Sequence, residues 1–156
     1  MEARDTVDPK DRRLIQALQE DGRMPVTTLA ERVGLSSNAT SERLRRLQRD
    51  GVIESFTVRL SAKALGRGLT AFVEVKLDRT SGEVFEAFAA AVRQIEGIEE
   101  CHMVAGGFDY LLKTRHRDMA DYRAFLSDVL VGLPGVRETR TYAVMEAVVE
   151  RHGPWV

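Results

Sequence analysis

Between residues 36 and 50, short polar side chains are followed by a concentration of arginines. Near the start of this segment, Asn38 can pair with adenine and Ser41 can bond to either type of base edge. The arginines that follow carry the charge that a phosphate backbone attracts, which adds affinity but little sequence information. The side chains expected to contact DNA are Ser36, Ser37, Asn38, Ser41, Arg45, Arg46 and Arg49.

The spacing of apolar residues predicts that this segment is a helix, capped by Ser36 or Ser37 and ended by Gly51. At 100° per residue, Thr40, Leu44 and Leu47 share one stripe and should pack inward. The polar and cationic side chains named above fall mainly on the opposite side, as a recognition helix requires. Arg43 lies nearer the core edge, where it either contacts phosphate or forms an internal ion pair.

Two helices are predicted before this segment. The first begins after the Asp8-Pro9 cap and ends at Asp21-Gly22. The second has Thr27 as its expected N-cap and ends at Gly34, where a left-handed residue is needed. Helix, short glycine turn and capped helix form the bihelical DNA-binding motif, although such units also occur as plain packing motifs.

The N-terminal unit is expected to carry a wing and to need a partner. Residues 52–60 are β-branched and partly alternating, so we expect a strand that leads to a glycine-rich hinge at 64–68. We place the domain boundary between residues 61 and 62. A three-helix unit of this size buries little apolar surface, and one recognition helix binds weakly, so we expect a dimer.

The C-terminal half predicts a ferredoxin-like domain. Strands are expected at 69–78, 98–105, 108–115 and 136–149, and helices at 81–92 and 118–130, with Met119 facing inward. Gly106-Gly107 should form a two-residue hairpin turn. The order is β-α-β-β-α-β, with both helices on one face of an antiparallel sheet. The other face, with residues such as Phe72, should be apolar and uncovered, which indicates sheet-to-sheet dimerisation.

Several segments together resemble the Lrp/AsnC family, over nearly the whole chain. In the C-terminal half they are Glu100–Arg115, Asp118–Arg123, Leu133–Val136 and Thr139–Tyr142, and in the N-terminal half Asp21–Arg23, Leu29–Ser36 and Glu42–Leu47. The resemblance implies an α+β protein, a three-helix winged helix-turn-helix followed by a ferredoxin-like (ACT-like) sensor domain. It also implies homodimers that assemble further, to octamers in many relatives, and a free amino acid, leucine or another, as effector.

The resemblance places the effector site around the hairpin, on Val104, Gly106, Gly107, Asp109, Tyr110, Met119 and Tyr142. Backbone N–H groups of a glycine turn can hold a carboxylate, and Asp109 could meet an ammonium group. Without the resemblance, the tyrosines and Met119 fit core or interface positions better than ligand contacts. Two departures stand out: Ser36–Thr40 lacks the Ser-Pro-x-Pro-Cys of many relatives, and Gly107 replaces an Asp.

Other classes of protein find little support in the sequence. No stretch approaches the roughly 20 apolar residues of a membrane helix, and no apolar leader is visible. The single cysteine, Cys101, excludes an internal disulfide, so the expected location is the cytoplasm. His102, His116 and His152 have no metal-ligand spacing, and no catalytic constellation can be assembled. We expect no metal, no cofactor and no enzyme activity.

The sequence thus predicts two domains, a helix-turn-helix over 1–61 and a sensing and oligomerisation domain over 62–156. The predicted function is sequence-specific transcriptional control of amino-acid metabolism genes, with double-stranded DNA and a small amino acid as partners. One alternative is an architectural nucleoid protein with little effector response. Another is the regulatory subunit of a metabolic enzyme, because ferredoxin-like domains bind amino acids there too; the helix-turn-helix argues against it.

Overall fold

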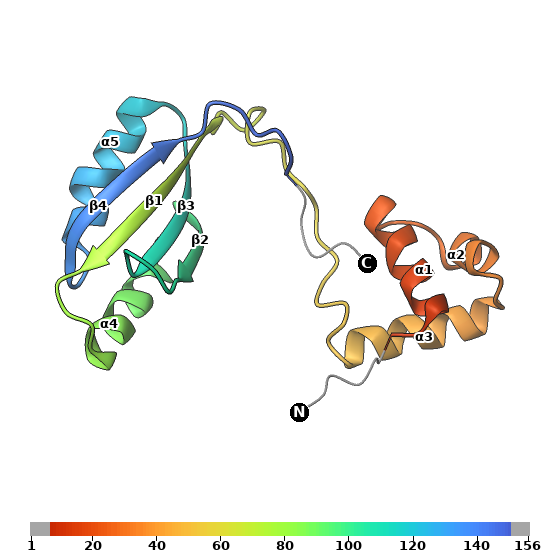
Figure 1. Ribbon diagram of the computed structural model, residues 1–156. Coiled ribbons are helices and arrows are strands. Elements are labelled where there is room, and N and C mark those ends of the chain that lie inside the picture. The colour runs from red at the N-terminus through yellow and green to blue at the C-terminus, as the bar shows by residue number, and fades with distance from the viewer. Residues whose placement is uncertain (1–6, 151–156) are drawn as a thin grey trace. The chain divides into compact units, whose positions relative to one another are not determined.

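The computed structural model describes residues 7–150, which form two compact units that divide between Arg59 and Leu60 (Figure 1). The boundary expected from the sequence lies two residues later. The last six residues of the expected second domain, His152 among them, lie outside the described residues.

Three helices make up the N-terminal unit: α1 (Pro9–Glu20), α2 (Val26–Val33) and α3 (Ser37–Arg49). The Asp8 cap of α1 is confirmed, because its side chain accepts from the backbone N–H groups of Lys10 and Asp11. Gly34 ends α2 with φ 64°, the left-handed conformation that the sequence predicted. The expected cap of α2 is wrong: Pro25 occupies that position, and Thr27 lies inside the helix.

The helices pack around a small core of Leu14, Ala17, Leu29 and Val33, with Leu44 against it. Thr40 and Leu47 of α3 are buried, which confirms the predicted inner face of that helix. The opposite face of α3 is therefore the one left to solvent.

The expected wing is absent from the described chain. Residues 52 and 53 form a bend, and residues 54–60 continue as an extended chain that is not assigned to a strand (Figure 1). Their sequence favours an extended backbone, but a strand also needs a hydrogen-bonded neighbour. Phe56, Val58 and Leu60 are consequently exposed, at 51%, 76% and 67%.

The C-terminal unit confirms the β-α-β-β-α-β order. Its elements are β1 (Leu69–Leu77), α4 (Gly82–Val92), β2 (Ile98–Met103), β3 (Tyr110–His116), α5 (Met119–Asp128), a 3-10 turn (Leu130–Gly132) and β4 (Val136–Ala143). All strand pairs are antiparallel, in the order β2-β3-β1-β4. The last strand is shorter than expected, since it ends at Ala143 and its pairing with β1 is followed by a single backbone hydrogen bond in the described chain, from Val144 to Thr70 at 2.9 Å.

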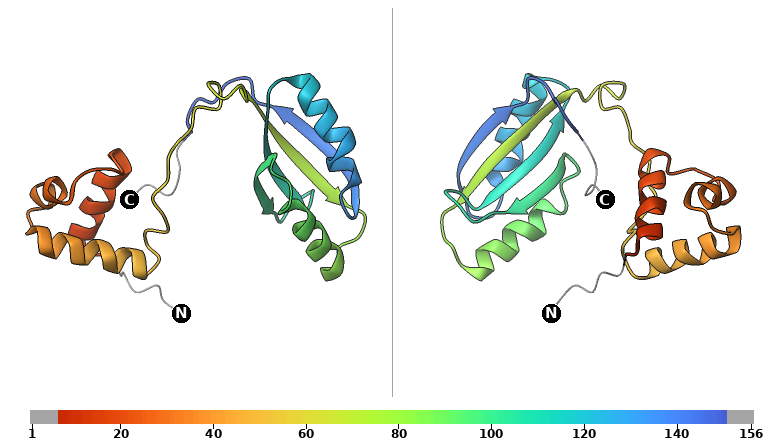
Figure 2. Two further views of the ribbon diagram at one scale, coloured as in Figure 1. Left: turned by 180° about the vertical axis from the view of Figure 1, so that it is seen from behind. Right: turned by 45° about the vertical axis from the view of Figure 1, so that its right-hand side comes forward.

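Both helices cover the same face of this sheet (Figure 2). Along β1 alternate side chains are buried, among them Val73 and Val75, and they meet Phe88 of α4 and Tyr122 of α5. Met119, expected to face inward, is 55% exposed at the start of α5.

The open face of the sheet is charged rather than apolar, which corrects the sequence-based expectation. Phe72 lies there, but in the same β1 row as Glu74 and Lys76. Neighbouring strands add further charges: Lys113 lies 3.0 Å from Glu100. The cause is register, because pairing aligns the polar positions of adjacent strands on one side.

Candidate DNA interface and effector site

The exposed face of α3 carries the polar and cationic side chains that the sequence singled out. Ser36 is the N-cap, and its hydroxyl accepts from the backbone N–H of Ala39 at 3.2 Å. Ser37, Asn38, Arg45 and Arg49 are exposed, and Ser41 is partly exposed. Among the described residues, Arg49 has one carboxylate as partner, that of the neighbouring Asp50 at 3.0 Å, and 75% of its side chain is exposed.

Arg46, expected to contact phosphate, forms an ion pair within the unit. Its guanidinium pairs with the buried carboxylate of Asp11, 2.5 Å away. Arg43 takes the internal alternative left open by the sequence, with Asp11 at 2.9 Å and Asp8 at 2.5 Å. The Arg43 guanidinium lowers the pKa of Asp8 from 3.8 to about 2. Sequence spacing could not show these pairs, because they join residues more than 30 positions apart.

Lys10 of α1 also contributes to this unit, although no sequence motif indicates it. Its ammonium group donates to the backbone carbonyls of Val33 at 2.5 Å and of Gly34 at 3.5 Å. A cation at these carbonyls stabilises the C-terminal end of α2. The turn before α3 is thus fixed by a side chain of α1.

The hairpin between β2 and β3 is wider than expected. Residues 104–109 separate the two strands, and neither Gly106 nor Gly107 has a positive φ, so the two-residue turn is wrong. Asp109 fixes the loop to β1: its carboxylate accepts from the backbone N–H of Leu77 at 2.7 Å, and its own N–H donates to Val75 at 3.0 Å. The glycines remain exposed, with open space where a side chain would stand.

The other expected effector residues lie in different environments. Tyr110 belongs to the core: it is 4% exposed and its ring lies 4.5 Å from that of Phe88. Burial raises the pKa of Tyr110. Val104 is half-buried, and its N–H donates to Asp109. Tyr142 is 47% exposed on the open face and donates to Glu74 at 3.0 Å.

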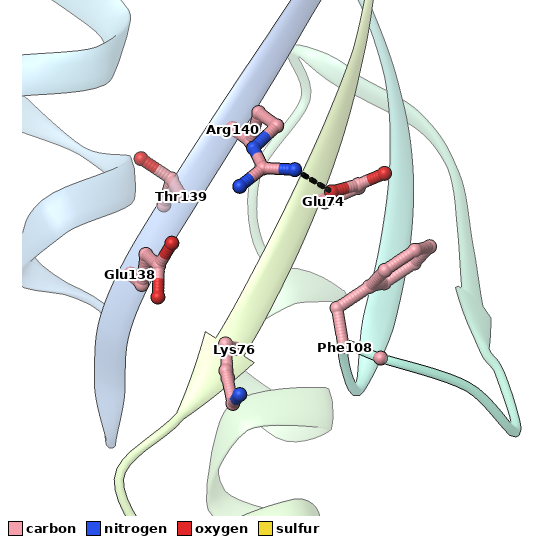
Figure 3. Close-up of a pocket in the computed structure, with 7 residues that line it drawn as sticks. Glu74, Lys76, Phe108, Glu138, Thr139 and Arg140 are labelled. Atoms are coloured by element: carbon pink, nitrogen blue, oxygen red, sulfur yellow. Dashed lines mark ion pairs between the residues drawn. The ribbon is translucent and has the colours of Figure 1, made fainter.

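A cavity of about 330 Å³ joins the hairpin to the open face of the sheet (Figure 3). Its lining residues are Glu74, Lys76, Gly107, Phe108, Glu138, Thr139 and Arg140. Strand pairing sets Glu74 beside Arg140 and Lys76 beside Glu138, so groups of both signs alternate around the opening. Of the effector residues expected from the sequence, only Gly107 lines this cavity. The charged lining residues could not be predicted from the sequence, because the register between β1 and β4 brings them together.

A second hollow, of about 500 Å³, lies along α5. It is lined by Met119, Ala120, Tyr122, Arg123 and Leu126 and is mainly apolar. Met119 therefore lies at a different hollow from the hairpin glycines, so the expected effector residues do not form one pocket within a single chain.

Neither a metal site nor a membrane-spanning helix is found in the described part of the chain. Residues 7–150 contain no group of three or more His, Cys, Asp or Glu side chains that could hold a metal ion. None of the helices described there has the length and apolar character that crossing a membrane requires.

The fold and the α3 face define a helix-turn-helix protein with a separate α+β domain. Residues 7–48 match the AsnC-type helix-turn-helix domain, and residues 70–154 match the Lrp/AsnC ligand binding domain. The chain belongs to the Lrp/AsnC family and is a transcriptional regulator of that type.

Named relatives agree with this assignment. The chain is 50% identical to the leucine-responsive regulatory protein of Salmonella typhimurium, over 91% of this chain and 87% of the relative. For the protein of that name from Escherichia coli K12 the identity is 49% over the same shares. A Neisseria meningitidis transcriptional regulator, solved as a complex with L-Met, is 32% identical with a TM-score of 0.89, over 94% of both chains. An AsnC family regulator from Agrobacterium tumefaciens is 28% identical with a TM-score of 0.90, over 95% and 96%.

Proposed function

We propose that this regulator reads specific DNA sequences through the exposed face of α3 and controls amino-acid metabolism genes in response to a small amino acid. The observation that carries the proposal is the face itself. Short polar groups near the start of α3, Asn38 and Ser41, precede the cations Arg45 and Arg49. A helix entering the major groove uses its N-terminal residues for base edges.

The effector is proposed to be an amino acid bound at the hairpin cavity. Lys76 and Arg140 offer cations to a carboxylate, whereas Glu74 and Glu138 offer anions to an ammonium group. The exposed Gly107 backbone at the rim leaves room for a ligand side chain. The names of the relatives and the L-Met complex of the Neisseria regulator support this class of ligand.

The working unit is proposed to be a homodimer that assembles further, to an octamer as in many members of the family. One three-helix unit has a small core and a single reading helix, so affinity requires a second copy. The open sheet face, with Phe72 among charged side chains, and the exposed apolar residues of 56–60 supply surfaces for self-association. Because its target is chromosomal DNA, the proposal places the protein in the cytoplasm.

Two sets of variants test the DNA face. Asn38→Ala and Ser41→Ala should relax base preference, by about 1–3 kcal/mol where a bidentate pair with a base is removed. Arg45→Glu and Arg49→Glu should weaken binding to every sequence and lower the salt slope by about 1 for each phosphate that is no longer neutralised. Fluorescence anisotropy measures the affinity of each variant for two duplexes. The selected duplex is one that the wild-type protein enriches from a random pool, and the scrambled duplex has the same bases in random order.

Each outcome of this test has a definite meaning. Unchanged affinity in both sets would contradict the assignment of the α3 face. Equal wild-type affinity for the selected and scrambled duplexes would instead indicate an architectural DNA-binding protein. Sedimentation of the same preparations measures the assembly, and a monomer indifferent to salt and to DNA would contradict the proposal as a whole.

A further inference from the structure

A fully buried carboxylate connects α1 to the middle of α3. Asp11 lies in the first turn of α1 with 0% exposure. One of its oxygens accepts from Arg43 at 2.9 Å, and the other accepts from Arg46 at 2.5 Å and from the backbone N–H of Asp8 at 3.1 Å. A buried charge is tolerated only when it is paired and hydrogen-bonded, and these interactions meet that condition.

Asp8 extends the connection. One of its oxygens caps α1, accepting from the N–H groups of Lys10 at 2.8 Å and Asp11 at 2.9 Å. The other accepts from Arg43 at 2.5 Å. Arg43 is therefore held by two carboxylates, and α1 cannot rotate or slide along α3 without breaking both ion pairs.

The same ion pairs divide the arginines of α3 into two sets. Arg43 and Arg46 are neutralised, although 28% and 37% of their side chains remain exposed at the edge of the helix. Arg45 is exposed, with no ion pair to the described part of the chain, and Arg49 pairs only with the exposed Asp50. Removal of the Asp11 carboxylate would release Arg46 from its ion pair and leave Arg43 with Asp8 as its one remaining carboxylate in the described chain, both side chains beside the DNA-facing surface and within reach of solvent.

We propose that Asp11, assisted by Asp8, is a positioning and specificity-determining residue. It holds Arg43 and Arg46 away from DNA phosphates, so that α3 presents base-reading groups with two cations rather than four. Binding to phosphate raises affinity for all sequences alike, so withholding two of these cations increases discrimination. This inference rests on the proposed DNA binding by α3.

The test is Asp11→Asn in the full-length protein, with affinity for the selected and scrambled duplexes measured over a salt series. The release of Arg46 should steepen the slope of log affinity against log salt by about 0.9, the change for one neutralised phosphate on duplex DNA. Arg43 keeps Asp8, so its contribution should be smaller, and the total steepening should lie between about 0.9 and 1.8. On lowering the salt from about 200 to 50 mM, affinity for the scrambled duplex should then rise about three- to twelvefold more than in the wild type. The ratio of selected to scrambled affinity should fall.

A purely structural role for Asp11 has a different signature: weaker binding to both duplexes with the slope unchanged. That result would overturn the proposal. The triple variant Asp11→Asn, Arg43→Gln, Arg46→Gln lacks the released cations and should return to the wild-type slope. Failure to return would also overturn it.

Glu20→Gln is the matched control. It removes one carboxylate from the same unit and breaks the pair with Arg32, at 2.6 Å, in which both side chains are largely exposed. Such pairs contribute little, and Arg32 lies on α2, so the slope should stay at the wild-type value. An equal steepening in this control would show that net charge alone is responsible, and would contradict the assigned role of Asp11.

Asp8→Asn is the alternative test variant if circular dichroism shows that Asp11→Asn is unfolded. Asparagine caps helices as well as aspartate does, so α1 should persist while Arg43 is left with one of its two carboxylates. The expected change is a steepening of less than about 0.9, and an unchanged slope would overturn the proposal. If wild-type protein binds neither duplex, or Arg45→Glu has no effect, the proposed function fails instead.

Discussion

The four arginines of α3 differ in what their guanidinium groups contact, although they lie within seven residues. Arg43 and Arg46 bind the carboxylates of α1, whereas Arg45 and Arg49 face solvent. A step of one to three residues around a helix turns a side chain from the domain edge to the DNA-facing surface. At the scale of single residues, function therefore depends on angular position as much as on residue type.

His116 gives a second residue-scale case, with a consequence for pH dependence. It is 4% exposed, packs its ring against Tyr122 and Phe125, and has Asp121 3.7 Å from Nδ1. Burial lowers its pKa; the Asp121 carboxylate opposes this shift and the Arg67 charge adds to it. Within the described chain, its Nε2 has no hydrogen-bond partner. The folded domain therefore favours neutral His116.

As pH falls below about 6.5, the unfolded chain binds a proton at this position that the folded chain does not, so stability should fall. The decrease attributable to His116 is at most about 1.4 kcal/mol for each pH unit. Urea unfolding at pH 7.5, 6.5 and 5.5 should show a smaller decline in His116→Leu than in the wild type. The exposed His102, changed to Gln, is the control and should keep the wild-type decline. Equal declines in wild type and His116→Leu would refute the prediction.

At the scale of elements, strand register decides what each face of the sheet offers. Pairing of β1 with β4 aligns Glu74 with Arg140 and Lys76 with Glu138, which builds the charged cavity. A shift of β4 by one residue would turn Glu138 and Arg140 toward the core, while Glu74 and Lys76 of β1 would stay on the open face. The segment that leads into β4 must therefore be held in place.

Gly135 is the residue that fixes this entry into β4. Its φ is +73°, and an added Cβ would stand 2.6 Å from Cγ1 of Val84 on α4. Gly135→Ala should destabilise the C-terminal unit by about 1–3 kcal/mol through overpacking, with backbone strain in addition. Gly132→Ala is the control, because a Cβ there meets nothing within 4 Å. The measurement is the melting temperature of each variant. Equal melting temperatures would contradict the prediction, because they would show that a small shift of Val84 relieves the close contact.

At the scale of the whole molecule, binding in one unit has to be linked to DNA binding by the other. Effector coupling in allosteric proteins is typically about 1–3 kcal/mol, which changes affinity about 5–150-fold. A ligand that prefers one assembly state also stabilises that state. Ligand binding, assembly and DNA affinity should therefore change together.

At least one of the natural amino acids should raise the melting temperature of the protein. At a ligand concentration one hundred times its Kd, the free energy of unfolding should increase by about 2.7 kcal/mol. Lys76→Gln should reduce the shift by removing a cation from the hairpin cavity. Lys63→Gln, outside that lining, is the charge-matched control and should retain it. If no amino acid changes either melting temperature or DNA affinity, the proposed effector response is refuted.

The sequence by itself determined the features that depend on near neighbours in the chain. Caps at Asp8 and Ser36, the turn at Gly34, the inner stripe of α3 and the alternation of β1 are local, and the structure confirms them. The order of strands and helices followed from the same periodicities. Local propensity also misled: residues 52–60 and 144–149 favour an extended chain but are not assigned to strands in the described structure.

Only the tertiary structure decided which distant groups meet. The pairing of Asp11 with Arg43 and Arg46, the burial of Tyr110 and the charged hairpin cavity each join residues far apart in the sequence. Such pairings depend on helix crossing and strand register, which are set by packing of the whole unit rather than by any one segment. For that reason the DNA-reading helix could be located from the sequence, whereas its available cations could not.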